Sequence, residues 1–157
     1  MESSRLYCKY TARPSSLQHI PTIVEKAYRN TIYGRPGPAY IDMPGDLLRA
    51  VIPEDQITLG PAVPRPPKCL PPAEQISQAA ELIKGAKRPL IIVGKGAGYA
   101  QAEGVVRDLV DRTNLPVLAT PMGKGLVSDL HKASVAPART LALQQADVIL
   151  LIGARLN

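Results

Sequence analysis

The chain has 157 residues, enough for one ordinary domain, and 45% of them are hydrophobic, so it can bury a core. It has no apolar run of the roughly 18 residues that a membrane span needs, and its start lacks the regions of a signal peptide, so we expect an intracellular protein without a membrane span. The net charge of +6 comes without a long basic run and without Phe or Trp, which argues against nucleic-acid binding and suits a small phosphorylated ligand.

The first predicted element is an amphipathic helix from Ser16 to Tyr33. Its apolar residues recur with the helical period, and Pro21 falls in the first turn, where the missing N–H does little harm. The sequence GRPGP at residues 34–38 ends this helix, because glycine can cap a helix and proline cannot continue one. A short strand is expected from Ala39 to Met43.

A proline-rich segment separates the two halves of the chain. Seven of the sixteen prolines lie between Pro53 and Pro72, and the segment has little helical or strand periodicity. This composition is typical of an extended linker. We therefore predict one domain segment in residues 1–48, a linker in residues 49–72 and a second domain segment in residues 73–157.

Helices and strands alternate after the linker. We expect strands at Pro89–Val93, Pro116–Ala119 and Asp147–Ile152, and helices at about Ala73–Lys87, Ala100–Arg112 and Pro137–Gln145. This alternation indicates right-handed βαβ crossovers, and the predicted fold class is α/β with a parallel, Rossmann-like sheet. Because open α/β sheets usually have more than three strands, we expect an incomplete sheet and a longer parent protein.

The cysteines and histidines do not indicate a metal centre or a catalytic dyad. Cys8 and Cys69 lie far apart without a CxxC spacing, so we interpret both as free thiols. His19 and His131 are equally isolated in the sequence, and we expect surface or capping roles for them.

Two strands run directly into glycine-containing loops, at residues 94–98 (GKGAG) and 153–157 (GARLN). Glycines at the end of a strand let backbone N–H groups approach a phosphate, and Lys95 and Arg155 would add positive charge. Because parallel strands end at the same edge of a sheet, we expect the two loops to be neighbours if their strands are close.

Two observations limit this interpretation of the loops. The spacing Gly94-x-Gly96-x-Gly98 differs from the GxGxxG fingerprint, and Ala119 and Thr120 stand where an acidic ribose-binding residue is expected, so a conventional NAD site is disfavoured. A tight strand-to-helix connection explains the glycines as well as phosphate binding does. A structural ion pair remains the alternative for Arg155.

Four segments of the sequence resemble the thiamine-diphosphate-dependent enzymes, and within them the 2-hydroxyacyl-CoA lyase and oxalyl-CoA decarboxylase branch. They are GRPGPAYIDMP at 34–44, AKRPLIIVGKGAGYA at 86–100, PMGKG at 121–125 and ADVILLIGARLN at 146–157. The sequence SDLHK at 128–132 departs from the family's usual Pro-Asp-Asn-His-Pro, which puts the geometry of that loop in doubt.

The resemblance implies a three-domain parent, with residues 1–48 as the end of its pyrimidine-binding domain and residues 73–157 as the first half of its central domain. The implied reaction is cleavage of a 2-hydroxyacyl-CoA to formyl-CoA and an aldehyde, with thiamine diphosphate and Mg²⁺, and oxalyl-CoA decarboxylation is the alternative. The family's catalytic Glu and its GDG metal-binding motif lie outside the matched region. We therefore expect no catalytic or metal-binding residue here, and no activity of the chain alone.

The resemblance also implies a nucleotide site for ADP or the nucleotide end of coenzyme A, at Arg35, Gly94, Lys95, Gly96 and Arg155. Alternatively, Arg35 is part of a turn that only ties the first domain segment to the linker. A non-catalytic ADP- or CoA-binding module is a second hypothesis, and an inactive chain with an exposed sheet edge is a third. The implied parent acts on an acyl-CoA in fatty acid α-oxidation and is a homo-oligomer, peroxisomal if eukaryotic and otherwise cytoplasmic.

Overall fold

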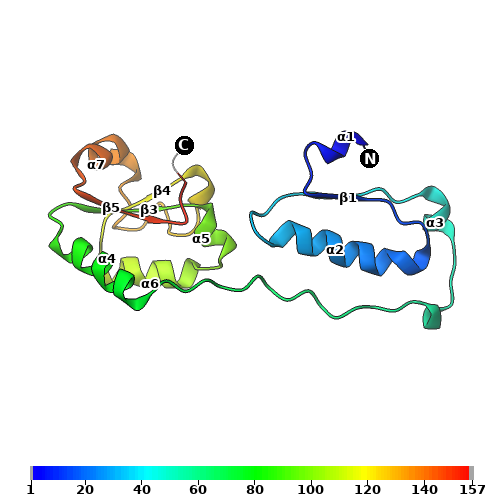
Figure 1. Ribbon diagram of the computed structural model, residues 1–157. Helices are drawn as coiled ribbons and strands as arrows, with labels where there is room; N and C mark the ends of the chain where they lie inside the picture. The colour runs from blue at the N-terminus through cyan, green and yellow to red at the C-terminus, as the bar shows by residue number, and fades with distance from the viewer. Residues whose placement is uncertain (1, 156–157) are drawn as a thin grey trace. The chain divides into compact units, whose positions relative to one another are not determined.

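The computed structural model describes residues 2–155, and the chain divides into two compact units, Met1–Leu70 and Pro71–Asn157 (Figure 1). The boundary between the units lies in the proline-rich segment. Each unit contains one small parallel sheet, of two and three strands respectively. Among the described residues, the longest helices have 13 residues, and none is long and apolar enough to cross a membrane.

The first unit is a helix packed on a two-stranded parallel sheet. Its elements are α1 (Glu2–Arg5), β1 (Tyr10–Ala12), η1 (Leu17–His19), α2 (Ile20–Ile32), β2 (Ala39–Ile41), α3 (Gly45–Arg49) and η2 (Glu54–Gln56). The predicted helix and strand are present, with a 3₁₀ turn at the start of the helix. Strand β1 was not predicted, because three residues of mixed polarity carry no clear periodicity.

The second unit is a three-stranded parallel sheet in the order β4-β3-β5, which confirms the predicted α/β class. Its elements are α4 (Ala73–Gly85), β3 (Pro89–Val93), α5 (Lys95–Tyr99), α6 (Glu103–Thr113), β4 (Val117–Ala119), η3 (Pro121–Gly123), η4 (Ala136–Ala138), α7 (Arg139–Gln145) and β5 (Val148–Ile152). The expected open glycine loop is a short helix, α5. A positive φ of 53° at Gln101 separates it from α6.

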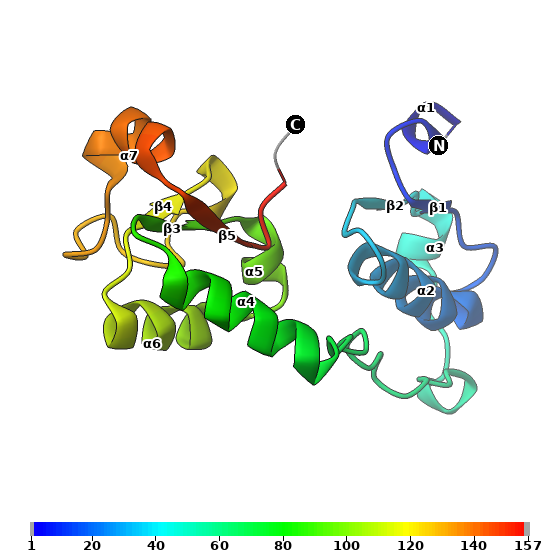
Figure 2. The same ribbon diagram turned by 60° about the vertical axis from the view of Figure 1, so that its left-hand side comes forward.

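Strand β3 lies at the centre of the core, and its residues Leu90–Val93 are all buried. Ile91 and Val93 pack with Val106 and Val110 of α6, whereas Leu90 and Ile92 pack on the opposite face, near Ala142 of α7. Figure 2 shows the same division, with α4 and α6 on one face of the sheet and α7 on the other. Burial on both faces explains why β3 is continuously apolar rather than alternating.

Asp147 fixes the start of β5 against the connection between α4 and β3. Its carboxylate accepts backbone N–H groups from Lys87 (2.7 Å) and Arg88 (2.9 Å), and its own N–H donates to Arg88 O (3.2 Å). Hydrogen bonds from Arg88 and then Lys87 stabilise the charged carboxylate and hold the pKa of Asp147 below its ordinary value.

We predict that Asp147→Asn lowers the thermal midpoint of this unit at pH 7, because an amide oxygen and NH₂ group cannot accept both N–H groups. A lowered folded-state pKa stabilises the fold above the unfolded pKa of about 3.9, and this contribution is lost as pH falls through the folded value. The difference in midpoint between wild type and Asp147→Asn should therefore shrink below about pH 4.

Calorimetry from pH 7 to pH 3 measures this difference. Asp108→Asn is the matched control, because the Asp108 carboxylate meets the exposed Arg112 side chain at 3.4 Å rather than two backbone donors. A midpoint difference for Asp147→Asn that stays constant down to pH 3 would contradict the account.

Candidate functional site

The candidate site lies at the carboxyl edge of the second unit's sheet, where β3, β4 and β5 all end. The chain passes from β3 to β4 on one side and later returns to β5 on the other, so the strand order reverses at β3. In open α/β sheets, ligands bind outside the carboxyl ends of the strands at such a switch point. The expectation that the two glycine loops are neighbours is confirmed, since β3 pairs directly with β5.

The glycines of the two loops pack backbone against backbone. A Cβ at Gly94 would lie 2.5 Å from Ala154 Cα, and a Cβ at Gly96 would lie 2.9 Å from Gly153 Cα. Gly153 has a φ of +61°, and a Cβ there would overlap the backbone nitrogen of Ala97. Only glycine allows this approach without displacing one of the two loops.

Three backbone N–H groups of the loop after β3 are used within the protein. Gly94 N–H donates to Ile152 O (2.9 Å), Gly96 N–H donates to Gly153 O (2.9 Å), and Ala97 N–H donates to Gly94 O (3.1 Å). The tight-connection explanation therefore accounts for the glycines. Nucleotide binding at Gly94 and Gly96 stays a prediction, and it would depend mainly on neighbouring side chains.

The segment after β4 also packs against the end of β3, through Gly123. This residue lies in η3, directly after β4, and a Cβ on it would overlap Val93 O and lie 3.1 Å from Gly94 Cα. Gly94 is thus enclosed between the β4 loop and the β5 loop. The sequence motif PMGKG at 121–125 has a packing role that sequence reasoning did not identify.

Two predicted cations lie on these loops. The Nζ of Lys95 is 5.9 Å from the centre of the Tyr99 ring, one helical turn away on α5. Arg155 is exposed, and its side chain has no hydrogen bond or ion pair with another described residue. The alternative of a structural ion pair is therefore not seen for Arg155 within residues 2–155, while Leu156 and Asn157 lie outside the described residues. A third cation, Lys124, pairs with Asp129 at 3.2 Å.

Arg35, the remaining predicted site residue, belongs to the first unit. It is exposed, and its backbone carbonyl accepts a hydrogen bond from Lys9 Nζ (2.8 Å), which also donates to Tyr33 O (2.6 Å). Lys9 thereby holds the turn that follows α2. This contact supports the alternative in which Arg35 belongs to a structural turn, and it uses the backbone carbonyl of Arg35 while its guanidinium stays exposed.

Helix α6 holds the loop after η3 through residues that the sequence did not single out. Arg107 donates to Leu126 O (2.8 Å) and Gly125 O (3.0 Å), and Asp111 lies 2.9 Å from His131 Nε2. His131 Nδ1 accepts the N–H of Ala133 (3.1 Å), so both ring nitrogens are occupied. His131 thereby links this loop to α6. The 20-residue separation of Asp111 and His131 left no sequence signal for their pairing.

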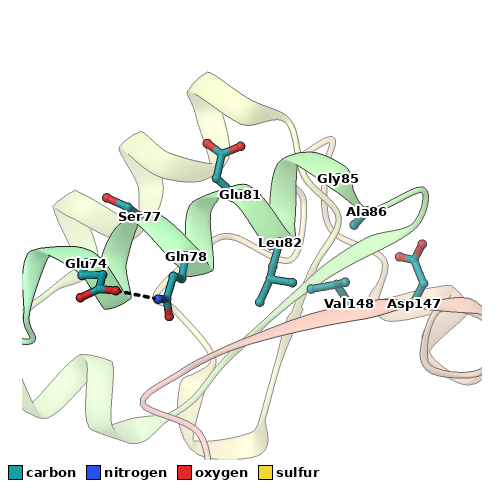
Figure 3. A pocket seen from close by; sticks show the side chains of 9 residues that line it. All are labelled: Glu74, Ser77, Gln78, Glu81, Leu82, Gly85, Ala86, Asp147 and Val148. Carbon is teal, nitrogen blue, oxygen red and sulfur yellow. Dashed lines mark hydrogen bonds between the residues drawn. The ribbon is translucent and has the colours of Figure 1, made fainter.

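Neither of the two described cavities coincides with the carboxyl edge. One, of about 520 Å³, lies beside Arg107 and His131. The other is an open groove of about 890 Å³ between α4 and the start of β5 (Figure 3). Residues 2–155 contain no group of three His, Cys, Asp or Glu side chains suited to hold a metal ion.

We predict a graded loss of stability in three glycine-to-alanine variants at this edge. Gly125→Ala meets open space at φ +90° and should lower the free energy of unfolding by about 1 kcal/mol through backbone strain alone. In Gly123→Ala the new methyl group would overlap Val93 O, but the backbone has no positive φ, so the free energy of unfolding should fall by about 2 kcal/mol. Gly153→Ala combines both and should lower it by about 3 kcal/mol or more.

Urea unfolding of the three variants measures this series, with Gly125→Ala as the internal control. Equal losses in all three variants would show that the strand ends are not packed backbone against backbone.

Comparison with known proteins identifies the family. The family described as thiamine pyrophosphate enzyme, central domain, matches residues 76–157. The 2-hydroxyacyl-CoA lyase 1 of Homo sapiens is 48% identical over 157 residues, which cover 100% of this chain and 27% of the relative. The 2-hydroxyacyl-CoA lyase of Oryza sativa subsp. japonica is 40% identical (99% and 28%), and the oxalyl-CoA decarboxylase of Escherichia coli K12 is 38% identical (100% and 28%).

This chain therefore spans about a quarter of the length of these curated relatives. The family match covers more than half of the chain and includes all three strands of its second unit. On this match, the chain belongs to the thiamine pyrophosphate enzyme family, of which residues 76–157 form part of the central domain.

Proposed function

We propose that this chain is part of a thiamine-diphosphate-dependent lyase that cleaves a 2-hydroxyacyl-CoA into formyl-CoA and an aldehyde one carbon shorter. The observation that carries the proposal is the 48% identity to the human 2-hydroxyacyl-CoA lyase 1 along the whole chain, together with the match to the central domain of the thiamine pyrophosphate enzymes. The Escherichia coli oxalyl-CoA decarboxylase is 38% identical over the same span. The lyase is therefore favoured and the decarboxylase is the alternative.

We place the chemistry outside these 157 residues. The sequence contains no GDG motif, and residues 2–155 offer no cluster of carboxylates for Mg²⁺. Thiamine diphosphate supplies an electron sink for carbon–carbon cleavage when it is bound, and its partners would come from other parts of a longer enzyme. Residues 1–48 would then complete a pyrimidine-binding domain.

The second unit would contribute a site for ADP or for the nucleotide end of coenzyme A. Support comes from the reversal of strand order at β3 and from the exposed Arg155 beside the Lys95 loop. Because the N–H groups of Gly94 and Gly96 are engaged, the two side chains would carry most of the phosphate recognition. Arg35 belongs to the first unit, and its part in nucleotide binding rests on the family resemblance alone.

The remaining features of the proposal rest on the family resemblance alone. They are an acyl-CoA substrate, a homo-oligomeric parent, a role in fatty acid α-oxidation, and a peroxisomal location in a eukaryote or a cytoplasmic one otherwise.

Nucleotide binding is tested by calorimetric titration of the chain with ADP and with coenzyme A. We expect measurable heat with at least one ligand, and we expect Lys95→Ala and Arg155→Ala each to raise Kd about tenfold, through loss of a charge-assisted contact. Arg112→Ala is the matched control, because Arg112 is also an exposed arginine, lies on α6, and pairs with Asp108 among the described residues.

Heat that disappears in the Arg112→Ala variant as strongly as in Arg155→Ala would indicate nonspecific charge attraction. No heat with the intact chain would remove both the nucleotide site and the hypothesis of a binding module.

The parent activity is tested by transplanting the chain. Residues 1–157 replace the aligned segment of the human lyase in one chimera and that of the Escherichia coli decarboxylase in another. We expect the lyase chimera to release aldehyde from a 2-hydroxyacyl-CoA with thiamine diphosphate and Mg²⁺, at a kcat/KM within about tenfold of its host. The decarboxylase chimera should lose a larger fraction of its activity on oxalyl-CoA.

Soluble expression and cofactor binding of each chimera serve as controls for folding. A folded lyase chimera without activity, alongside a decarboxylase chimera that keeps full activity, would favour the decarboxylase assignment.

A further inference from the structure

The loop between η3 and η4, residues 124–135, is fixed by different contacts at its two ends. At its start, Arg107 of α6 donates to two backbone carbonyls. At its end, the chain runs beside β4: Val117 N–H donates to Ala133 O (2.9 Å), and Val135 N–H donates to Val117 O (3.1 Å). All of these contacts join α6, β4 and the loop, at the edge of the sheet opposite β5.

The second end of the loop contains a buried backbone donor with an unusual partner. Ala133 is 6% exposed, so its N–H needs an acceptor within the protein. The acceptor is the imidazole of His131, whose Nδ1 lies 3.1 Å away. Among residues 2–155 no backbone carbonyl accepts this N–H. The hydrogen bonding of a buried peptide group therefore depends on a side chain that can take up a proton.

The two partners of the His131 ring define where its proton lies. A backbone N–H can only donate, so Nδ1 must be unprotonated to accept the N–H of Ala133, and the neutral ring then carries its proton on Nε2. The Nε2–H group donates to the carboxylate of Asp111, 2.9 Å away. The His131 side chain is 21% exposed. The neutral Nε2–H tautomer thus satisfies both partners at once.

We propose that His131 is a pH-sensitive latch, which holds residues 128–135 in place while Nδ1 is unprotonated and releases them when Nδ1 takes up a proton. Protonation changes Nδ1 from an acceptor into a donor that faces another donor, so the hydrogen bond from Ala133 is lost. This bond stabilises the loop at neutral and higher pH. Its contribution is lost as pH falls through the range in which an imidazole gains its second proton.

The charged groups that face His131 act in opposite directions. Asp111 of α6 favours the imidazolium, but its side chain is 64% exposed, so water screens the attraction. Arg107 of α6 lines the same cavity of about 520 Å³ and disfavours a second positive charge. Strand β4 has no charged side chain. The loop adds three charged residues, all exposed: Lys124 and Asp129, which pair at 3.2 Å, and Lys132. Loss of the buried acceptor therefore outweighs the gain at the exposed carboxylate.

Arg107 limits the release to one end of the loop. A guanidinium keeps its charge throughout the pH range of the latch, so its hydrogen bonds to Gly125 O and Leu126 O persist. Gly123, which packs against the end of β3, precedes these two residues and should stay in place. Acid should therefore loosen the segment beside β4 and leave the carboxyl edge of the sheet intact.

Hydrogen exchange of the 157-residue chain at pH 7.5 and at pH 5, followed by NMR and corrected for the intrinsic exchange rate, tests the latch. We expect the protection factor of Ala133 to fall at least about tenfold between these pH values. That of Leu126, whose N–H donates to Gly123 O, should change less than about twofold. The ring ¹⁵N shifts of His131 should show the Nε2–H tautomer at pH 7.5. The lyase chimera carries the same residues and serves as a second host.

Two replacements that do not titrate separate a latch from a purely structural contact. An asparagine amide reaches about as far as Nδ1, so His131→Asn should keep Ala133 protected at pH 7.5 and remove the pH dependence. A glutamine amide reaches about as far as Nε2, so His131→Gln should reduce the protection at both pH values. Asp111→Asn removes the charge that favours the imidazolium and should move the release to lower pH. Asp108→Asn is the matched control, because Asp108 lies on the same helix and pairs with Arg112.

Three results would overturn the proposal. The first is a protection factor of Ala133 that is the same at pH 7.5 and pH 5. The second is a wild-type His131 ring that carries its proton on Nδ1 at pH 7.5. The third is a tenfold loss of protection that persists in His131→Asn, because the release would then come from another group.

Discussion

The carboxyl ends of three parallel strands meet in this protein with almost no space between their backbones. Gly94 directly follows β3 and is enclosed by Gly123 after β4 and by Gly153 and Ala154 after β5. A single methyl group at Gly123 or Gly153 would overlap a neighbouring backbone atom. The register of the sheet, the short helix α5 and the positions of Lys95 and Arg155 all depend on this contact.

A glycine-rich loop can both hold strand ends together and bind phosphate, and in this protein the two roles fall to different groups. The glycines and their N–H groups hold the strand ends together, so binding of a phosphorylated ligand would fall to the side chains that leave the packed region. Lys95 and Arg155 occupy such positions at the point where strand order reverses. The packed edge would then act as a rigid support for the proposed nucleotide site, which suits a domain whose enzyme would perform its chemistry elsewhere.

Sequence reasoning predicted the α/β class, the three strands of the second unit and the proximity of the two glycine loops. These features follow from continuous apolar strands such as Leu90–Val93 and from the rule that parallel strands end at one edge. It did not find the roles of Gly123, Arg107 or Asp111, because their partners lie in other elements and only the folded chain brings them together. It also treated Gly94 and Gly96 as free donors, since a sequence does not reveal which acceptor a backbone N–H meets.

The exchange of the Gly94 and Gly96 amides in the ligand-free chain, followed by NMR and repeated with saturating ADP, tests the central claim most directly. The packed strand ends predict slow exchange of both amides without ligand and little change with it, while the side-chain resonance of Arg155 shifts on binding. Fast exchange without ligand and strong protection with ADP would contradict the account, because the loop would then be an open phosphate cradle.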